Sequence, residues 1–196
     1  MSTGPIAVAL LLAEVFDRLG VPYLIGGSVA SSILGEPRST EDVDIFADLG
    51  EPGLDEFVAA VDKEFYLDRE AAAEALRLRS SFNMIFLEGM LKVDVFLCRD
   101  RGHDREEMRR RREIALVADP EKRVWIASPE DLVLKKIEWF QAGGGVSERQ
   151  WRDLLGILKV QGEALDFAYL RRWAEELGLT PLLTKALVEA GLLPEG

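Results

Sequence analysis

Apolar and polar positions follow two different periods along the first 127 residues. Apolar residues at helical spacing predict helices over residues 6–19, 29–34, 54–65 and 69–78, and a charged helix or arm over 105–113. Short apolar runs predict strands over residues 22–25, 43–47, 82–87, 91–98, 114–117 and 124–127. Glu88-Gly89-Met90 predicts a hairpin turn, and Asp119-Pro120 predicts a second turn. The mixture of strands and helices indicates an α/β (α+β) region.

The pattern changes after residue 127. Ser128-Pro129-Glu130 predicts a helix start, because proline is well accommodated in a first helical turn. Beyond it the spacing predicts only helices, over residues 129–141, 147–159, 164–177 and 181–190. We therefore predict an α/β domain over residues 1–127 and a C-terminal helical domain over residues 128–196.

The amino-acid composition limits the ligands and the kinds of site expected of this chain. The 196 residues include 24 Lys or Arg and 35 Asp or Glu, which gives a formal net charge of −11. Such a chain repels nucleic acid outside a local basic patch, so a small phosphate ligand carried by a divalent cation fits it better. The single cysteine, Cys98, excludes an internal disulfide and favours a cytoplasmic location. The single histidine, His103, argues against a histidine-based triad, and no apolar run is long enough to predict a membrane span.

Three aspartates stand out on the predicted strands. Residues i and i+2 of a strand point to the same side, so Asp42 and Asp44 project together while Val43 and Ile45 face the core. Asp94 lies opposite the apolar face of the strand over residues 91–98. If the two strands are neighbours, three carboxylates converge, and such a set calls for a hard divalent cation, Mg²⁺ or Mn²⁺. Each aspartate taken alone is equally well explained as a strand-end or turn residue.

A glycine-serine turn precedes these carboxylates. Gly26, Gly27 and Ser28 lie between a predicted strand and a predicted helix that Ser28 can cap. Glycines let the backbone approach a ligand closely, and a helix start offers free N–H groups to a phosphate. The spacing matches neither the P-loop nor the dinucleotide-binding fingerprint.

Together these motifs resemble the nucleotidyltransferase superfamily that includes DNA polymerase beta. Within it the chain is most similar to minimal bacterial nucleotidyltransferases of the abortive-infection, toxin-like kind. The resemblance covers roughly residues 20 to 155. It rests on GGSVAS at residues 26–31, RSTEDVDI at 38–45, KVDVF at 92–96 and SPEDL at 128–132. It implies a small mixed sheet flanked by helices, followed by a helical bundle.

The resemblance also implies roles for individual residues. Asp42 and Asp44 would ligate two metal ions, and Asp94 would ligate the catalytic one and act as the base or position it. Gly26, Gly27 and Ser28 would hold the phosphates of a nucleoside triphosphate (NTP). An acceptor hydroxyl would then attack the α-phosphorus in line and release pyrophosphate.

Basic residues outside this core admit two interpretations each. Arg38 either pairs with a phosphate or is a solvated loop arginine, and Lys136 either reaches the triphosphate or extends to solvent. Arg149 and Asp153 either shape the site or form a helical ion pair. The run Arg109–Arg112 is either a solvated face balanced by nearby glutamates or a contact for RNA.

Two classes of function therefore remain. The first is a metal-dependent nucleotidyltransferase acting on a hydroxyl of RNA, protein or a small molecule, with a toxin-like or tRNA-modifying role ahead of antibiotic modification. The second is a non-catalytic protein of the same fold that binds a nucleotide or a cognate antitoxin. Neither predicts a membrane partner, and both leave an oligomer open.

Overall fold

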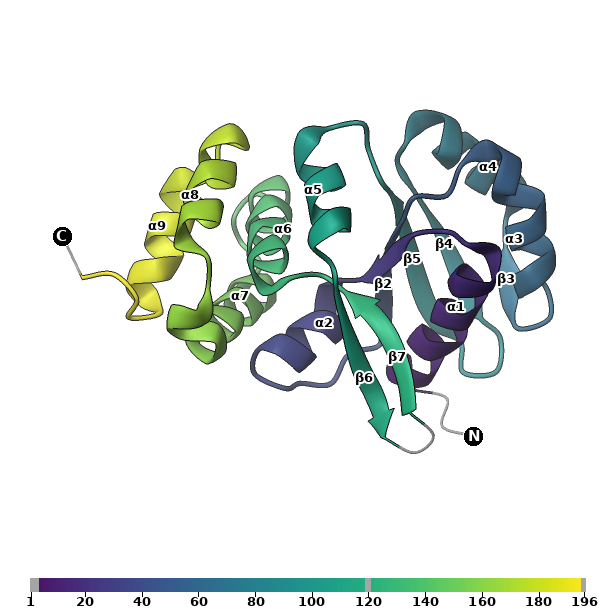
Figure 1. Ribbon diagram of the computed structural model, residues 1–196, viewed down its shortest axis with the longest axis horizontal. Coiled ribbons are helices and arrows are strands. Elements are labelled where there is room, and N and C mark those ends of the chain that lie inside the picture. The colour runs from purple at the N-terminus through teal and green to yellow at the C-terminus, as the bar shows by residue number, and fades with distance from the viewer. Residues whose placement is uncertain (1–3, 119–120, 195–196) are drawn as a thin grey trace. The chain divides into compact units, whose positions relative to one another are not determined.

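The computed structural model describes residues 4–118 and 121–194 (Figure 1). These residues form two compact units. The first contains the described residues up to Val29 together with Thr40–Ala127, and the second contains Ala30–Ser39 and the described residues from Ser128 onward. The predicted turn at residues 119–120 lies outside the described residues.

The first unit is built on a mixed sheet. Its described strands are β1 (Tyr23–Ile25), β2 (Asp42–Ala47), β3 (Phe65–Leu67), β4 (Ser81–Phe86), β5 (Leu91–Leu97), β6 (Arg112–Ala118) and β7 (Glu121–Ile126). They are ordered β3-β4-β5-β2-β1-β7-β6. The pairs β2–β5 and β1–β7 are parallel, and the other neighbouring pairs are antiparallel. This confirms the predicted α/β class with a mixed sheet.

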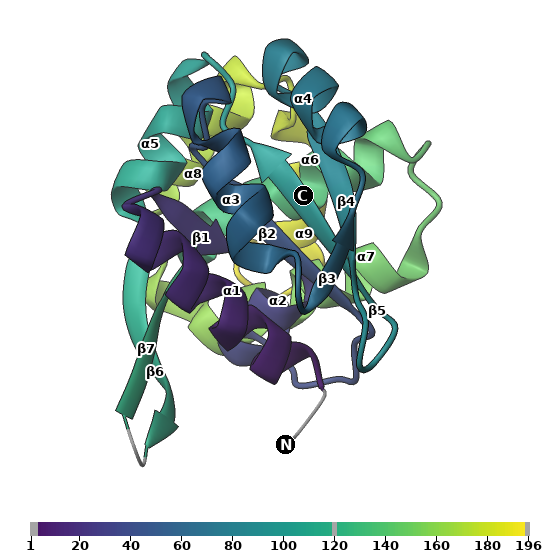
Figure 2. The ribbon, with the colours of Figure 1, turned by 90° about the vertical axis from the view of Figure 1, so that its right-hand side faces the viewer.

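Helices cover one face of this sheet more fully than the other. The helices of this unit are α1 (Pro5–Leu19), α3 (Leu54–Val61), α4 (Arg69–Leu78) and α5 (Gly102–Arg110), with a short 3₁₀ turn η1 (Glu51–Gly53). Figures 1 and 2 show α1, α3 and α4 together on one side. Aromatic stacking of Phe16 on Tyr23 and on Phe57, with centroids 5.4 and 5.2 Å apart, joins α1, β1 and α3 there. A buried core on one face leaves part of the opposite face available for chemistry.

Two predicted helices end earlier than the pattern suggested. The helix predicted over residues 54–65 ends at Val61, and Phe65 begins β3, which pairs with β4. The charged segment predicted over residues 105–113 ends as a helix at Arg110, and Arg112 begins β6. In both cases non-local strand pairing outweighs local helical spacing.

The second unit is helical. It contains α6 (Pro129–Ala142), α7 (Glu148–Gln161), a 3₁₀ turn η2 (Gly162–Ala164), α8 (Phe167–Glu176) and α9 (Thr180–Glu189). Ser128 caps α6 by accepting a hydrogen bond from the backbone N–H of Asp131 at 3.1 Å, as its sequence signal indicates. Among the described helices, none combines the length and the apolar character that crossing a membrane would require.

One helix spans the boundary between the units. Helix α2 (Gly27–Leu34) begins in the first unit and ends in the second, where the loop over residues 35–39 follows it. Close packing fixes this segment, because a β-carbon on Gly35 would come within 2.8 Å of the Ile157 backbone nitrogen. The side-chain amide of Gln161 also donates to the carbonyl of Leu34 at 2.6 Å.

Candidate active site

The pairing of β2 with β5 places the three aspartates on one face of the sheet. Asp44 lies directly opposite Asp94, and Asp42 lies opposite Lys92. Val43, Ile45, Val93 and Val95 alternate with them and are fully buried on the other face. The aspartates therefore share the face that α1, α3 and α4 leave uncovered, as the period of two predicts.

The ammonium group of Lys92 lies beside these carboxylates and contacts one of them directly. Lys92 Nζ donates to Asp94 Oδ2 at 2.8 Å. This hydrogen bond raises the pKa of Lys92; partial burial opposes the shift, and the charges of Asp94, Asp42 and Asp44 add to it. A set of oxygen donors that stabilises a cation in this way has the chemistry that Mg²⁺ and Mn²⁺ prefer. Asp42, Asp44 and Asp94 therefore supply suitable oxygen donors on one sheet face, but in this structure their ligand atoms do not all lie within 4.8 Å of one another, so a divalent cation there would have to draw them together.

The glycine turn packs directly against one of these carboxylates. The Gly26 N–H donates to the carbonyl of Asp44 at 2.9 Å, which aligns the end of β1 with β2. Gly27 has a φ of +54°, and a β-carbon there would overlap the Asp44 carboxylate. Both constraints select glycine, so the turn and the metal-ligand candidate form one structural feature.

Ser28 occupies a different position from the one predicted. Helix α2 begins at Gly27 rather than at residue 29, so Ser28 lies in the first turn instead of capping it. Gly27, the first residue of α2, has a left-handed backbone with a positive φ. The first-turn N–H groups of α2 thus begin beside Asp44.

Arg38 and Lys136 meet at one carboxylate in the helical unit. Arg38 forms two hydrogen bonds with Asp153, from Nε at 2.6 Å and from a terminal nitrogen at 2.7 Å. Lys136 Nζ donates to the same carboxylate at 2.9 Å, and its side chain is 1% exposed. Burial by itself raises the pKa of Asp153, but the hydrogen bonds from Arg38 and Lys136 outweigh it and hold the pKa below its ordinary value.

This arrangement decides between several readings of the sequence. Lys136 does not extend to solvent, and the described partners of Asp153 are Arg38 and Lys136 rather than Arg149. Sequence spacing cannot find this cluster, because Arg38 and Asp153 lie 115 positions apart. The one available signal was Lys136 on the core-facing stripe of its helix, where a buried charge needs a partner.

The basic run at residues 109–112 is divided between several roles. Arg109 forms an ion pair with Glu106, and Arg111 donates to the carbonyl of Met108 at 2.7 Å. The Arg111 guanidinium also lies over the Trp125 ring, 4.5 Å from its centroid. Arg112 belongs to β6. The described contacts therefore tie much of this run to the protein itself.

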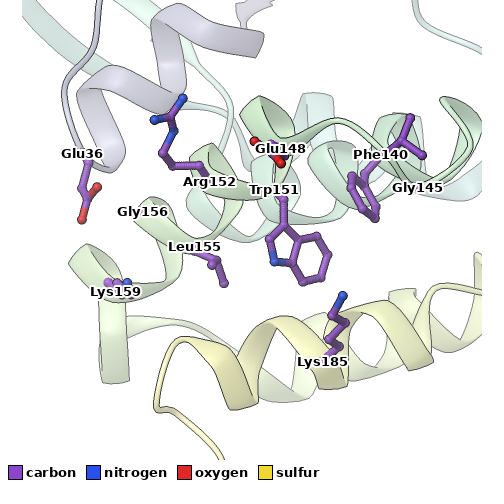
Figure 3. A pocket seen from close by; sticks show the side chains of 11 residues that line it. Glu36, Phe140, Gly145, Glu148, Trp151, Arg152, Leu155, Gly156, Lys159 and Lys185 are labelled. Carbon is purple, nitrogen blue, oxygen red and sulfur yellow. The ribbon is translucent and has the colours of Figure 1, made fainter.

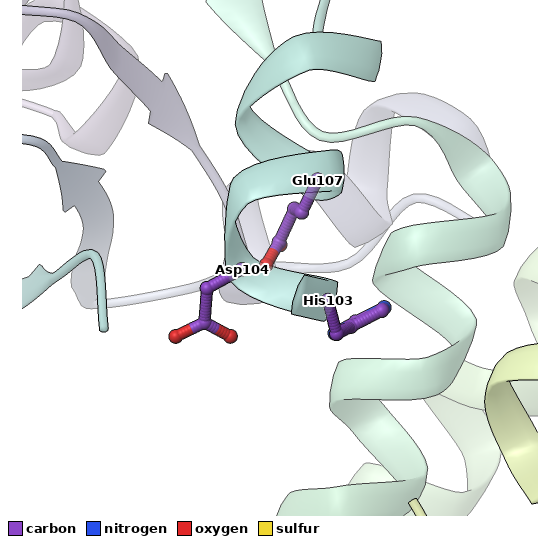
Figure 4. A group of neighbouring side chains, drawn as sticks. All are labelled: His103, Asp104 and Glu107. Carbon is purple, nitrogen blue, oxygen red and sulfur yellow. The ribbon is translucent and has the colours of Figure 1, made fainter. Parts of the chain in front are cut away.

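Helix α5 carries a buried group of possible metal ligands that sequence reasoning did not identify. Figure 4 shows His103, Asp104 and Glu107 together on this helix. One ligand atom from each lies within 4.8 Å of the others, and among the described residues this is the group of three that meets that spacing. Asp104 accepts hydrogen bonds from Arg101 at 2.6 Å and from the Arg99 backbone at 3.1 Å, so its charge is already compensated.

The helical unit contains a cavity of about 290 Å³ (Figure 3). Phe140 and Trp151 contribute aromatic rings whose centroids lie 4.8 Å apart. Lys185 lies over the Trp151 ring, and Trp151 Nε1 donates to Glu189 at 2.6 Å. These contacts organise the cavity wall, which Arg152 and Lys159 also line.

Comparison with known proteins identifies the fold. No protein-family model matches the chain, and no curated protein matches it in sequence. Solved structures do match. An antigenic nucleotidyltransferase-like protein from Paracoccidioides brasiliensis aligns over 95% of this chain and 93% of its own, with a TM-score of 0.54 and 18% identity.

Two antibiotic-modifying proteins share the fold as well. ANT(2'')-Ia in complex with adenylyl-2''-tobramycin aligns over 88% of this chain and 97% of its own, with a TM-score of 0.59 and 15% identity. The lincosamide antibiotic adenylyltransferase LnuA, with lincomycin bound, covers 76% and 93%, with a TM-score of 0.50 and 13% identity. The chain thus has the fold of nucleotidyltransferase-like proteins.

Proposed function

We propose that this protein is a metal-dependent nucleotidyltransferase that moves a nucleoside monophosphate from an NTP to an acceptor hydroxyl. The observation that supports this most strongly is the alignment of Asp42, Asp44 and Asp94 on one sheet face beside Gly27. Fold alone does not define activity, but this fold combined with a carboxylate set and a glycine turn favours phosphoryl chemistry.

In this proposal the three carboxylates hold Mg²⁺ or Mn²⁺. The bound cation would supply neutralisation of charge on the transferring phosphoryl group. Asp94 accepts the proton of the attacking hydroxyl or positions the group that does. Gly26, Gly27 and Ser28 receive the phosphate tail, because glycines let a ligand approach the backbone closely and the dipole at a helix start favours an anion.

Arg38 and Lys136 are proposed to bind phosphate groups of the NTP. Two cations share the single Asp153 carboxylate, and Lys136 is almost fully buried. Guanidinium and ammonium groups form charge-assisted hydrogen bonds with phosphate oxygens, which is the chemistry this proposal needs. Asp153 would act as a positioning residue, since it holds both cations by hydrogen bonds.

A direct assay tests the proposal. The protein is incubated with α-labelled NTPs, Mg²⁺ and cell extract, and label is followed into RNA, protein and small molecules. We expect Asp44→Asn to lower labelling at least a hundredfold, because one metal ligand is lost. Asp48→Asn is the matched control, because Asp48 lies just beyond the same strand in an exposed pair with Arg79. Nucleotide binding without pyrophosphate release would instead favour the non-catalytic alternative.

The biological role forms a separate part of the proposal. The abortive-infection resemblance suggests a toxin that an antitoxin protein restrains. Expression of the wild-type chain should then arrest growth of a bacterial host, and Asp44→Asn should relieve the arrest. If growth is unaffected and resistance to aminoglycosides or lincosamides rises instead, antibiotic modification is the role.

A further inference from the structure

The uncovered sheet face continues past the aspartates onto β4 and β3. In strand register, Asn83 lies opposite Asp94, Ile85 lies opposite Lys92, and Tyr66 lies opposite Ile85. Side chains of directly paired residues share a face, so these residues extend the plane of Asp42, Asp44 and Asp94. Adjacent strands are about 4.8 Å apart, so Tyr66 lies on a strand roughly 10 Å from β5.

This extension is apolar and exposed. Four residues define what we call the apolar strip: Tyr66, Ile85, Leu87 and Met90. Tyr66 is 61% exposed, Leu87 48% and Met90 74%, although each is large and apolar. Leu87 lies beside β3, where its N–H donates to the carbonyl of Glu64 at 2.9 Å. An exposed group of apolar side chains next to a reactive centre marks an interaction surface.

The order of the strands indicates the side from which an acceptor would approach, and the apolar strip lies on that side. The phosphate-binding turn follows β1, on one side of β2, whereas β5, β4 and β3 follow on the other side. In-line transfer requires the attacking oxygen to approach opposite the leaving pyrophosphate. The acceptor therefore arrives from the β5 side, over β4 and β3, where the apolar strip lies.

Exposure and charge select the kind of acceptor. Side chains that expose more than half of their surface, such as Tyr66 and Met90, project outward, whereas small-molecule sites enclose most of their ligand. A chain with a net charge of −11 also disfavours a polyanion on a strip of apolar side chains. An extended polypeptide fits both properties, because apolar side chains can cover the strip while a hydroxyl reaches Asp94.

We propose that the acceptor is a polypeptide segment that presents a serine, threonine or tyrosine hydroxyl flanked by apolar side chains. This rests on the proposed nucleotidyltransferase function. The side-chain oxygen attacks the α-phosphorus of the NTP, and its proton passes to Asp94 and then to solvent. A new oxygen–phosphorus bond forms as the bond from the α-phosphorus to the bridging oxygen breaks, and pyrophosphate leaves.

Short synthetic peptides test this inference. One set carries a single serine or tyrosine flanked by leucine and phenylalanine, and a matched set replaces these flanks with aspartate and lysine. Each is incubated with the protein, the four NTPs and Mn²⁺, and mass spectrometry measures the gain of a nucleoside monophosphate. We expect kcat/KM to be at least tenfold higher for the apolar set, from the burial of several apolar groups. An RNA oligonucleotide is the third substrate.

Substitutions in the apolar strip test its role in peptide binding separately from the catalytic step. We expect Tyr66→Asp and Met90→Asp each to lower kcat/KM for the apolar peptides about tenfold, mainly through KM. Leu78→Asp is the matched control, because Leu78 is 65% exposed at the end of α4, outside the strip. Met90 lies in a turn, so its substitution leaves strand packing intact.

The outcomes distinguish this inference from the proposed function. Equal labelling of both peptide sets, labelling of RNA alone, or no effect of the strip variants overturns the polypeptide acceptor while transferase activity stands. Failure to label any peptide, with Mn²⁺-dependent NTP binding intact, overturns it as well. Loss of NTP binding by the wild-type protein itself would overturn both proposals.

Discussion

The α-carbon of Gly27 lies against the carboxylate of Asp44, leaving no space for a side chain. A β-carbon at residue 27 would overlap Asp44 and come within 2.7 Å of its Cβ. Gly27 also has a left-handed backbone with a φ of +54°. The glycine turn and a metal-ligand candidate are thus fixed by one contact.

Gly27→Ala should therefore abolish nucleotide transfer and lower stability by more than backbone strain alone. Gly20→Ala is the matched control, because Gly20 has a φ of +65° and nothing within 4 Å of its added β-carbon. Strain of that kind costs about 1 kcal/mol. Urea unfolding and NTP binding measure both variants. A Gly27 variant no less stable than the Gly20 variant would contradict the proposed contact.

In the proposed metal site, Lys92 would compete with the cation for Asp94. The Lys92 side chain is half exposed and donates to Asp94 at 2.8 Å, so a bound cation must replace this interaction. An exposed ion pair is weak, so Lys92→Met should lower the Kd for Mn²⁺ about threefold. Calorimetry measures the affinity, and Lys122→Met, which removes a lysine paired with Glu14, should leave it unchanged. Weaker Mn²⁺ binding in Lys92→Met would show that Lys92 supports the metal site instead.

Asp153 stabilises the helical unit through its ion pairs with Arg38 and Lys136. Asp153→Asn leaves the buried Lys136 without a charged acceptor at this position, and breaking a buried ion pair costs about 3 kcal/mol. Asp55→Asn, which removes an exposed pair with Arg69, should cost about 0.5 kcal/mol or less. Urea unfolding at neutral pH measures both variants.

The same substitution has a pH signature. The pKa of Asp153 in the folded protein lies below its ordinary value of 3.8, so its stabilisation is fully present above that value. It is lost as the pH falls through the folded pKa. The difference in unfolding free energy between wild type and Asp153→Asn should therefore shrink in acid. A difference independent of pH would assign the effect to packing rather than to charge.

Cys98 should be unreactive in the folded protein. Burial, followed by the nearby charges of Asp48, Asp104 and Glu107, raises the pKa of its thiol from 9.0 to about 11. The thiolate fraction near neutral pH is then about a hundredfold lower, and the thiolate is the reactive form. Iodoacetamide should alkylate the native protein about a hundredfold more slowly than the urea-unfolded chain. Comparable rates would show that Cys98 is accessible and ionises normally.

Local sequence patterns were sufficient to predict many of the helices and strands and which of their side chains share a face. Period-two alternation predicted that Asp42 and Asp44 share a face, and that Asp94 lies opposite the apolar side of its own strand. Helical spacing predicted α4 with the observed bounds. Strand β3 was missed because three residues carry too little periodicity, and only its pairing with β4 stabilises it as a strand.

Contacts between residues distant in the sequence decided which strands are neighbours and which side chains meet. The parallel alignment of β2 and β5 sets Asp44 opposite Asp94, and no local pattern specifies which strands become neighbours. The meeting of Arg38 with Asp153 across 115 positions depends on the packing of the α2 loop against α7. Periodicity determines which side chains share a face, because backbone geometry repeats along each element. Tertiary contacts determine which faces and strands adjoin, because burial and backbone hydrogen bonding are satisfied across the whole chain.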